Sequence, residues 1–197
     1  MIARHTVSIL FYVLLIGTTL IIGSAAAADP VTEQQLLTEL QEGNHVILLR
    51  HALAPGIGDP DHFQVDDCQT QRNLSQAGRD QAVRIGARLQ QAGITEADVY
   101  TSQWCRCIET AKLLGLGEPV EFSVLNSFFR NFDREKAQTA ALQKWLMNNT
   151  LKRPAILVTH QVNITALTSI FPDSGEMVLM RKTGDGNLEV VGSIHTE

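Results

Sequence analysis

Four side chains suited to nucleophilic and anion-binding chemistry stand at the ends of short apolar runs, or just behind them. Arg50 and His51 follow one such run, His160 ends another, and Arg106 lies in the first turn of the helix expected after a third. A neutral imidazole is a competent nucleophile near its ordinary pKa of about 6.5, and a guanidinium offers an oxyanion a planar fork of donors. These residue types indicate a nucleophile beside an anion pocket, provided that the fold brings them together.

The rest of the chain predicts the elements that would do so. Apolar runs predict strands at 45–49, 98–101, 120–122 and 155–159. Apolar residues at helical spacing predict helices at 31–40, 76–91, 104–114, 134–147 and 163–170. Thr32 with Gln35 forms a capping box for the first helix, and Ser75 caps the second.

The order of these elements predicts the fold class. Strands alternate with helices, and a hairpin is expected from 177–180 and 188–194 around the turn 184–186. We therefore expect an α/β fold, a three-layer α/β/α sandwich with a mainly parallel central sheet and a C-terminal antiparallel hairpin. Ligands of such sheets bind beyond the carboxyl ends of the strands, which is where the two histidines and two arginines are expected to converge.

Length and composition limit the class of protein. The chain has 197 residues, of which 44% are hydrophobic and 19% charged. This composition is typical of a globular domain and excludes a disordered chain, a collagen-like repeat and a disulfide-dense miniprotein. Lys and Arg number 16 against 21 Asp and Glu, a net charge of −5, and no basic block is present. A nucleic acid is therefore not expected as a partner.

The first 28 residues are typical of a secretory signal peptide. Arg4 and His5 precede an apolar run, and alanines at 25–28 form a small-residue cleavage site. We expect cleavage before Asp29, which leaves 29–197 as the folded domain of an exported protein, periplasmic or secreted. The alternative is an uncleaved anchor, because the run 7–23 is close to the length that spans a bilayer. Membrane contact is expected through this segment alone.

Three cysteines would then enter an oxidising compartment: Cys68, Cys105 and Cys107. Cysteines two positions apart rarely bridge each other, so a disulfide is expected from Cys68 to Cys105 or to Cys107. Three free thiols are the alternative. The clustered Cys and His pairs of a structural metal site are absent from the sequence, and no metal is expected.

Four segments, in the same order, resemble the histidine phosphatase superfamily, which includes the phosphoglycerate mutases. Leu49-Arg50-His51-Ala52 resembles its Arg-His-Gly signature, with alanine in place of the glycine. Residues 74–82 (LSQAGRDQA) are similar to its Leu-Thr-x-x-Gly-x-x-Gln-Ala helix, 102–111 (SQWCRCIETA) to its Ser-x-x-x-Arg-x-x-x-Thr-Ala segment, and 158–160 to its second histidine motif. The similarity runs from about residue 45 to 170 and is to the small exported phosphatases.

The resemblance implies phosphoryl transfer through a phosphohistidine, with no metal or cofactor. His51 is then the nucleophile, and its second ring nitrogen needs an acceptor that fixes the tautomer. Arg50, Arg106 and a protonated His160 are the expected donors to the transferring group. The expected partner is a phosphorylated substrate, either a small molecule, a glycolipid or a phosphoprotein.

Three further residues are candidates for substrate binding. Arg72 precedes the Ser75 helix and would reach the phosphate, although a surface arginine is the alternative. Ser102 is a candidate ligand, with a turn or capping residue as the alternative. Gln161 follows the second histidine where one branch of the family has aspartate, so it can orient a leaving group but cannot protonate it.

The general acid is the least determined part of the site. Other members place a glutamate after the third strand, where this chain has Ser127. Asp133 is the first candidate, with the capping of the following helix as the alternative. Glu135 is second, and the remaining, weaker candidates are Glu176 and Asp59.

Together these features predict an exported phosphatase that hydrolyses a phosphomonoester through phospho-His51. A phosphate of the cell envelope, on the lipopolysaccharide core, is the expected substrate, and a phosphoprotein is the alternative. A second hypothesis from another class is a catalytically weak phosphate-binding module of the envelope, because Gln161 and Ser127 replace acids.

Overall fold

The computed structural model describes residues 32–42, 44–150, 153–184 and 186–196. The expected signal peptide, residues 1–28, lies outside these ranges. Within them, no helix combines the length and the apolar character that a membrane crossing needs.

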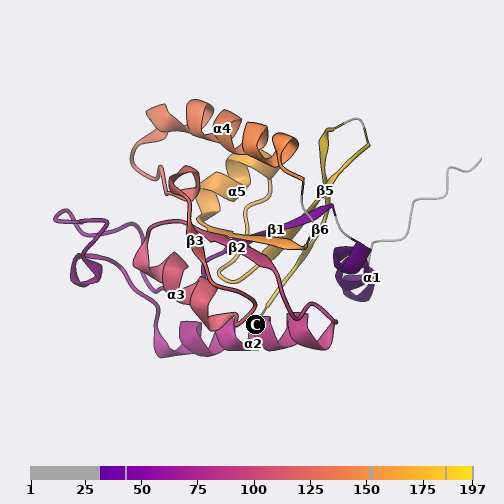
Figure 1. Ribbon diagram of the computed structural model, residues 1–197. Coiled ribbons are helices and arrows are strands. Elements are labelled where there is room, and N and C mark those ends of the chain that lie inside the picture. The colour runs from indigo at the N-terminus through magenta and orange to yellow at the C-terminus, as the bar shows by residue number, and fades with distance from the viewer. Residues whose placement is uncertain (1–31, 43, 151–152, 185, 197) are drawn as a thin grey trace, which may run out of the picture. The chain divides into compact units, whose positions relative to one another are not determined.

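The described chain forms one mixed sheet of six strands in the order β3-β2-β4-β1-β5-β6 (Figure 1). The pairs β1–β4, β2–β4 and β2–β3 are parallel, whereas β1–β5 and β5–β6 are antiparallel. The expected C-terminal antiparallel hairpin is thereby confirmed. The strands are β1 (His45–Arg50), β2 (Asp98–Thr101), β3 (Val120–Glu121), β4 (Ala155–Thr159), β5 (Met177–Lys182) and β6 (Leu188–Ile194).

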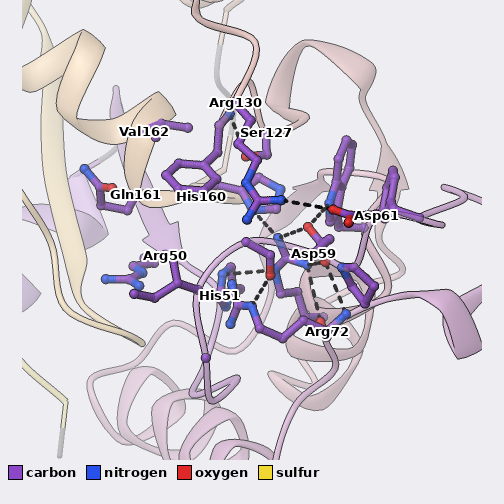
Figure 2. Close-up of a pocket in the computed structure, with 18 of the residues that line it drawn as sticks. Arg50, His51, Asp59, Asp61, Arg72, Ser127, Arg130, His160, Gln161 and Val162 are labelled. Atoms are coloured by element: carbon purple, nitrogen blue, oxygen red, sulfur yellow. Dashed lines mark hydrogen bonds and ion pairs between the residues drawn. The ribbon is translucent and has the colours of Figure 1, made fainter.

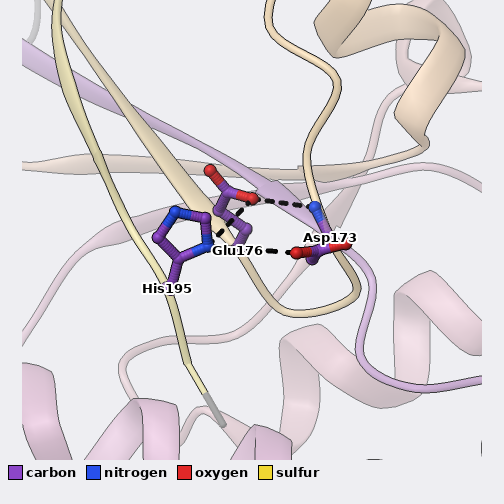
Figure 3. Close-up of side chains that lie close together, drawn as sticks. All are labelled: Asp173, Glu176 and His195. Atoms are coloured by element: carbon purple, nitrogen blue, oxygen red, sulfur yellow. Dashed lines mark hydrogen bonds and ion pairs between the residues drawn. The ribbon is translucent and has the colours of Figure 1, made fainter.

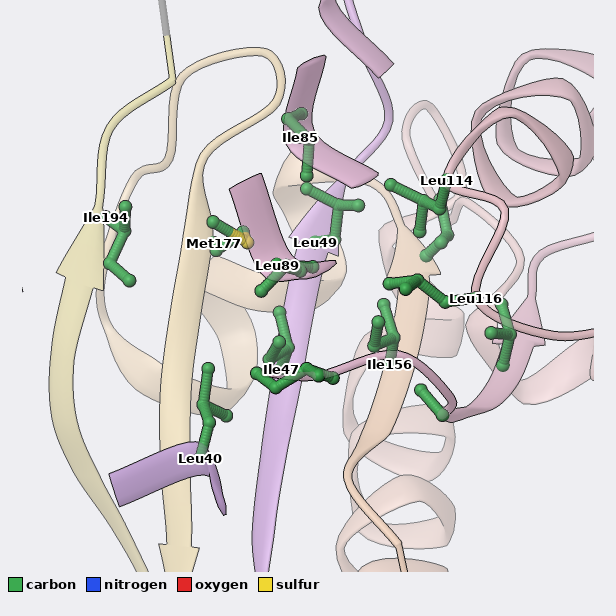
Figure 4. Close-up of a cluster of buried hydrophobic side chains, with 14 of the residues drawn as sticks. Leu40, Ile47, Leu49, Ile85, Leu89, Leu114, Leu116, Ile156, Met177 and Ile194 are labelled. Atoms are coloured by element: carbon green, nitrogen blue, oxygen red, sulfur yellow. The ribbon is translucent and has the colours of Figure 1, made fainter. Parts of the chain in front are cut away.

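Helices cover both faces of the sheet. On one face lie α1 (Glu33–Glu39), α2 (Gln76–Gln91) and α3 (Cys105–Leu113), and on the other α4 (Glu135–Asn148) and α5 (Gln161–Thr168). Strand β1 shows why: Ile47 and Leu49 point into one core cluster, and Val46 and Leu48 into the other. A strand buried on both faces reads as a continuous apolar run. The expected three-layer sandwich is confirmed, and Figure 4 shows the core between the sheet and α1, α2 and α3.

Most element boundaries follow the expected signals. The Thr32–Gln35 capping box is present, and the Ser75 hydroxyl accepts a hydrogen bond from Gly78 N at 3.1 Å. The last helix was expected from residue 163 but begins at Gln161, because His160 keeps extended backbone angles and the helix starts directly after it. Strand β3 is shorter than expected and ends at Glu121.

A disulfide joins the loop after β1 to the start of α3. It links Cys68 to Cys105, which settles the two pairings left open by the sequence. Cys107 is the free cysteine of the described chain, and burial raises the pKa of its thiol to about 12. The loop that carries Cys68 is thus fixed beside the helix that carries Arg106.

Close backbone packing holds the same loop on α2. A Cβ atom on Gly78 would stand 2.1 Å from the carbonyl oxygen of Leu53, so glycine is required at this crossing. Ala52, which replaces the glycine of the family signature, is fully buried and is not among the described residues at positive φ. The methyl group is therefore accommodated without backbone strain.

Candidate active site

A cavity of about 510 Å³ opens beyond the carboxyl ends of the central strands (Figure 2). Arg50 and His51 reach it from the end of β1, His160 from the end of β4, and Arg106 from the first turn of α3. The parallel register explains the convergence: Arg50 pairs with Thr159, so the two histidines leave the sheet at the same level. The structure thus brings together the four residues first singled out in the sequence.

His51 is held as a neutral ring with an unprotonated Nε2. Its Nδ1 lies 2.8 Å from the carbonyl oxygen of Ala52, which can only accept, so Nδ1 carries the proton. This contact supplies the acceptor expected from the sequence. Burial and then the charge of Arg106 lower the pKa of His51 well below its ordinary value. Nε2 therefore stays unprotonated even in mildly acidic solution.

Arg106 joins the two histidines at the bottom of the cavity. Its buried side chain donates from Nε to His51 Nε2 at 3.2 Å and from Nη2 to His160 Nδ1 at 3.4 Å. The two imidazole centroids are 5.5 Å apart. A phosphate oxygen bound here would face the nucleophile and the guanidinium at once.

His160 is oriented from behind by a short hydrogen-bond chain. Its Nδ1 accepts from Arg106, so Nε2 carries the proton and donates to Ser102 Oγ at 2.8 Å. Ser102 Oγ in turn donates to Asn126 Oδ1 at 3.2 Å. Burial, then the charges of Arg106 and His51, lower the pKa of His160 well below its ordinary value. The structure thus favours a neutral ring, in contrast to the protonated donor expected from the sequence.

Arg50 approaches the cavity from a different side and is half-buried. Its Nη1 donates to the carbonyl oxygen of Pro172 at 2.7 Å. Burial lowers the pKa of Arg50, while the nearby charge of Asp173 opposes this shift. Arg50 N donates to the carbonyl oxygen of Glu176 at 3.2 Å, and the Glu176 carboxylate accepts from Asp173 N at 2.8 Å and faces His195 Nδ1 at 3.4 Å (Figure 3). Glu176 is therefore absent from the cavity lining and fixes the loop beside Arg50 instead.

Asp59 is the carboxylate that the structure places against Arg106. It accepts from Arg106 Nη1 at 2.7 Å, Arg106 Nη2 at 3.1 Å, Trp104 Nε1 at 3.0 Å and Arg72 N at 3.1 Å. Burial acts to raise the pKa of Asp59, but the bonds from Arg106 and Trp104 outweigh it, and the pKa lies below its ordinary value. The sequence analysis placed Asp59 among the weaker candidates for the general acid. The sequence signal that could have raised Asp59 as a candidate is Cys68, because its disulfide to Cys105 brings the loop that carries Asp59 to α3.

The remaining sequence candidates divide into those that line the cavity and those that do not. Arg72 lines it, with Nε bonded to the carbonyl oxygen of Gly58 at 2.8 Å, and burial lowers its pKa to about 10. Gln161 lines it from the first turn of α5. Ser102 is buried behind His160 and is not part of the lining, which favours the turn-residue alternative over a direct ligand.

Asp133, the first candidate for the acid, does not reach the cavity. It is exposed in the 3-10 turn Phe132–Arg134, outside the residues that line the pocket. The chain turns sharply before it, at Arg130 with φ 66°, so that Phe129 and Arg130 face the cavity instead. No side chain caps α4, so the capping alternative for Asp133 is not observed either.

The comparisons with known proteins agree with this geometry. Residues 46–128, which carry His51 and Arg106, match the family model of the histidine phosphatase superfamily, branch 1. No curated protein sequence matches the chain.

Several solved structures share the fold. The protein histidine phosphatase SixA complexed with tungstate has a TM-score of 0.56 at 15% identity, over 76% of this chain and 96% of that one. A putative phosphohistidine phosphatase SixA from Agrobacterium tumefaciens gives 0.53 at 18%, over 78% and 98%. A mycobacterial glucosyl-3-phosphoglycerate phosphatase complexed with VO3 gives 0.56 at 14%, over 76% and 98%. At these identities the likeness establishes the fold.

Proposed function

We propose that this chain is an exported phosphatase that hydrolyses a phosphomonoester through a phosphohistidine on His51. The observation that carries the proposal is the contact of Arg106 with both His51 Nε2 and His160 Nδ1 in one cavity. The nucleophile has a fixed tautomer, and cationic side chains of Arg50, Arg72 and Arg106 surround the space in front of it. Two of the structural neighbours were solved with oxyanions, tungstate and VO3, which supports the same type of ligand here.

The proposed reaction has two displacements at phosphorus. In the first, His51 Nε2 attacks the phosphorus, the ester P–O bond breaks, and the leaving oxygen takes a proton. In the second, water attacks, the P–N bond breaks, and inorganic phosphate leaves. Arg106, Arg50 and Arg72 bind the non-bridging oxygens, whose charge is spread out in the transition state. Catalysis here is mostly positioning and electrostatic stabilisation.

Asp59 is the carboxylate that moves the proton in this scheme, in place of Asp133. Its lowered pKa means that it is ionised at neutral pH. A phosphomonoester with a second pKa of about 6 brings a proton as its monoanion. Two anionic groups that face each other share that proton. Asp59 therefore transfers the substrate's own proton to the leaving oxygen, and later accepts one from the attacking water.

A cell-envelope phosphate, such as one on the lipopolysaccharide core, is the proposed substrate, with a phosphoprotein as the alternative. The Cys68–Cys105 disulfide supports an oxidising compartment, and residues 1–28 have the pattern of a signal peptide. One structural neighbour is named a protein histidine phosphatase and another a glucosyl-3-phosphoglycerate phosphatase, which supports a fold open to both protein and small-molecule phosphates. Mass spectrometry of the mature N-terminus tests export, and an intact Met1 would contradict cleavage.

The test of the activity is turnover of p-nitrophenyl phosphate with a metal chelator present. We expect His51→Ala to abolish it and His62→Ala to retain it, because His62 is an exposed loop residue outside the cavity lining. Rapid acid-free quenching with labelled substrate should trap label on His51. Label on another side chain, or turnover by His51→Ala, would overturn the proposal.

A catalytically weak phosphate-binding module is the second candidate. Gln161 and Ser127 both line the cavity, and the resemblance to the histidine phosphatases places acids at these two positions. Titration calorimetry with inorganic phosphate separates the two functions. Binding without turnover of any ester would favour the module.

A further inference from the structure

Part of the cavity lining consists of apolar side chains that are at least partly open to water. We call Ile57, Phe63, Phe129 and Phe171 the apolar collar. Ile57 is 85% exposed, Phe171 72% and Phe129 40%. Phe63 stacks on Trp104, with ring centroids 4.9 Å apart, and Trp104 is hydrogen-bonded to Asp59 beside Arg106. Through Trp104, Phe63 therefore connects the collar to Asp59 and Arg106 at the bottom of the cavity.

The collar residues come from three separate segments of the chain. Ile57 and Phe63 lie in the loop after β1, Phe129 in the segment before α4, and Phe171 in the loop after α5. Single exposed apolar residues are common on protein surfaces, but their convergence on one cavity calls for a ligand that removes them from water. A cavity that combines the cationic side chains of Arg50, Arg72 and Arg106 with the apolar collar fits a molecule that has an anion at one end and a hydrocarbon next to it.

We propose that the ester group in the substrate of this phosphatase is a hydrocarbon, so that the enzyme acts on phosphomonoesters of apolar alcohols. This inference rests on the proposed hydrolysis through His51, and it favours a phosphate on an apolar alcohol of the envelope over the lipopolysaccharide core phosphate named above. The charge of the phosphate would be met by Arg106 and Arg50, and the hydrocarbon would cover the collar. A hydroxyl-rich alcohol would leave the collar uncovered, because the collar side chains offer neither donors nor acceptors, although Asp61, Arg130 and Gln161 also line the cavity.

The test compares esters that differ in apolar area but not in leaving-group acidity. Ethyl, butyl and hexyl phosphate are hydrolysed in turn, and the release of inorganic phosphate is measured. A fully buried methylene is worth about fourfold in affinity, and one that is half-covered about twofold. We therefore expect kcat/KM to rise about tenfold or more from ethyl to hexyl phosphate. Naphthyl against phenyl phosphate is the second arm, which tells a ring-shaped hydrocarbon from a chain.

Variants connect the effect to the collar. Phe171→Ser and Ile57→Ser should bring the hexyl-to-ethyl ratio of kcat/KM down towards one. Val83→Ser is the matched control, since Val83 is a half-exposed apolar residue on α2 outside the cavity, and it should keep the wild-type ratio. Circular dichroism shows whether each variant is folded.

The outcomes separate the inference from the proposed function. Turnover of ethyl and hexyl phosphate at equal kcat/KM would overturn the inference and leave the phosphatase intact. A ratio that survives both collar variants would place the hydrocarbon elsewhere and would also overturn it. If the folded protein hydrolyses no ester, including p-nitrophenyl phosphate, then the proposed function itself fails.

Discussion

The substitution Asp59→Asn tests the proton transfer most directly. The Asp59 carboxylate accepts bonds from Arg106, Trp104 and the backbone of Arg72. An amide of the same shape keeps one acceptor oxygen for two of the four donors, turns its NH2 group towards the other two, and cannot take up a proton. General acid–base catalysis is worth about 10²–10⁴-fold, so kcat for an alkyl phosphate should fall by that factor. With p-nitrophenyl phosphate the loss should be below about tenfold, because that leaving group departs without a proton.

The pH dependence gives a second readout of the same step. The proton arrives with the substrate monoanion, so kcat/KM of the wild type should fall with rising pH above about 6, the second pKa of the ester. The pKa of His51 lies well below its ordinary value, which keeps the nucleophile neutral as the pH falls through 6.5. Activity should therefore persist into the acidic range. Asp59→Asn should lose the decline above pH 6 for alkyl esters.

Two matched variants decide between Asp59 and other carboxylates. Asp61 also lines the cavity, but its side chain is fully exposed and lies 3.7 Å from Arg130. Asp133 is the candidate that the sequence ranked first. Both Asp61→Asn and Asp133→Asn should keep near wild-type kcat on alkyl phosphate. A faster Asp59→Asn enzyme with tighter phosphate binding would refute the reasoning, since it would show that Asp59 only competes with phosphate for Arg106.

Three further predictions concern the Arg106 guanidinium, the Cys68–Cys105 disulfide and the packing of Gly78 against Leu53. Arg106→Lys should lower kcat about 10²–10³-fold, measured with p-nitrophenyl phosphate, because an ammonium cannot donate along both edges of the fork. Cys68→Ser removes the bridge to Cys105, which closes a separation of 37 residues, and should lower the free energy of unfolding by about 3–4 kcal/mol in urea titrations. Gly78→Ala should destabilise the fold by about 1–3 kcal/mol or more, because its Cβ would stand 2.1 Å from a backbone carbonyl oxygen. Gly184→Ala, with no atom within 4 Å of the new Cβ, is the matched control and should unfold at the wild-type urea concentration.

The architecture and the centre of the site could be predicted from local patterns. The strand 45–49 is apolar throughout because helices cover both faces of the sheet. Parallel strands place their following residues at one edge, so His51 and His160 meet although 109 positions separate them. Arg106 joins them from the next helix, as its position after Ser102 indicated.

The proposed proton carrier, Asp59, could not be predicted, because its position depends on how loops fold. The chain reaches Asp59 through turns in which Gly56 and Gly58 have φ of 98° and 70°, and no periodicity in the sequence reports such turns. Asp133 looked suitable by its place in the sequence, yet a left-handed residue at Arg130 directs the chain away from the cavity. The charge state of His160 could not be predicted from the sequence either, because its lowered pKa depends on burial beside Arg106.

The site has two halves of different origin. His51, Arg106 and His160 are anchored at the ends of the buried central strands and the first turn of α3, where the register of β1 against β4 fixes their separation. Asp59 and the collar are supplied by loops that fasten to this frame at a few points, such as the bond between Cys68 and Cys105. Grafting other loops between the same strand ends would therefore change the collar and the carboxylate at Asp59 while His51, Arg106 and His160 stay where they are.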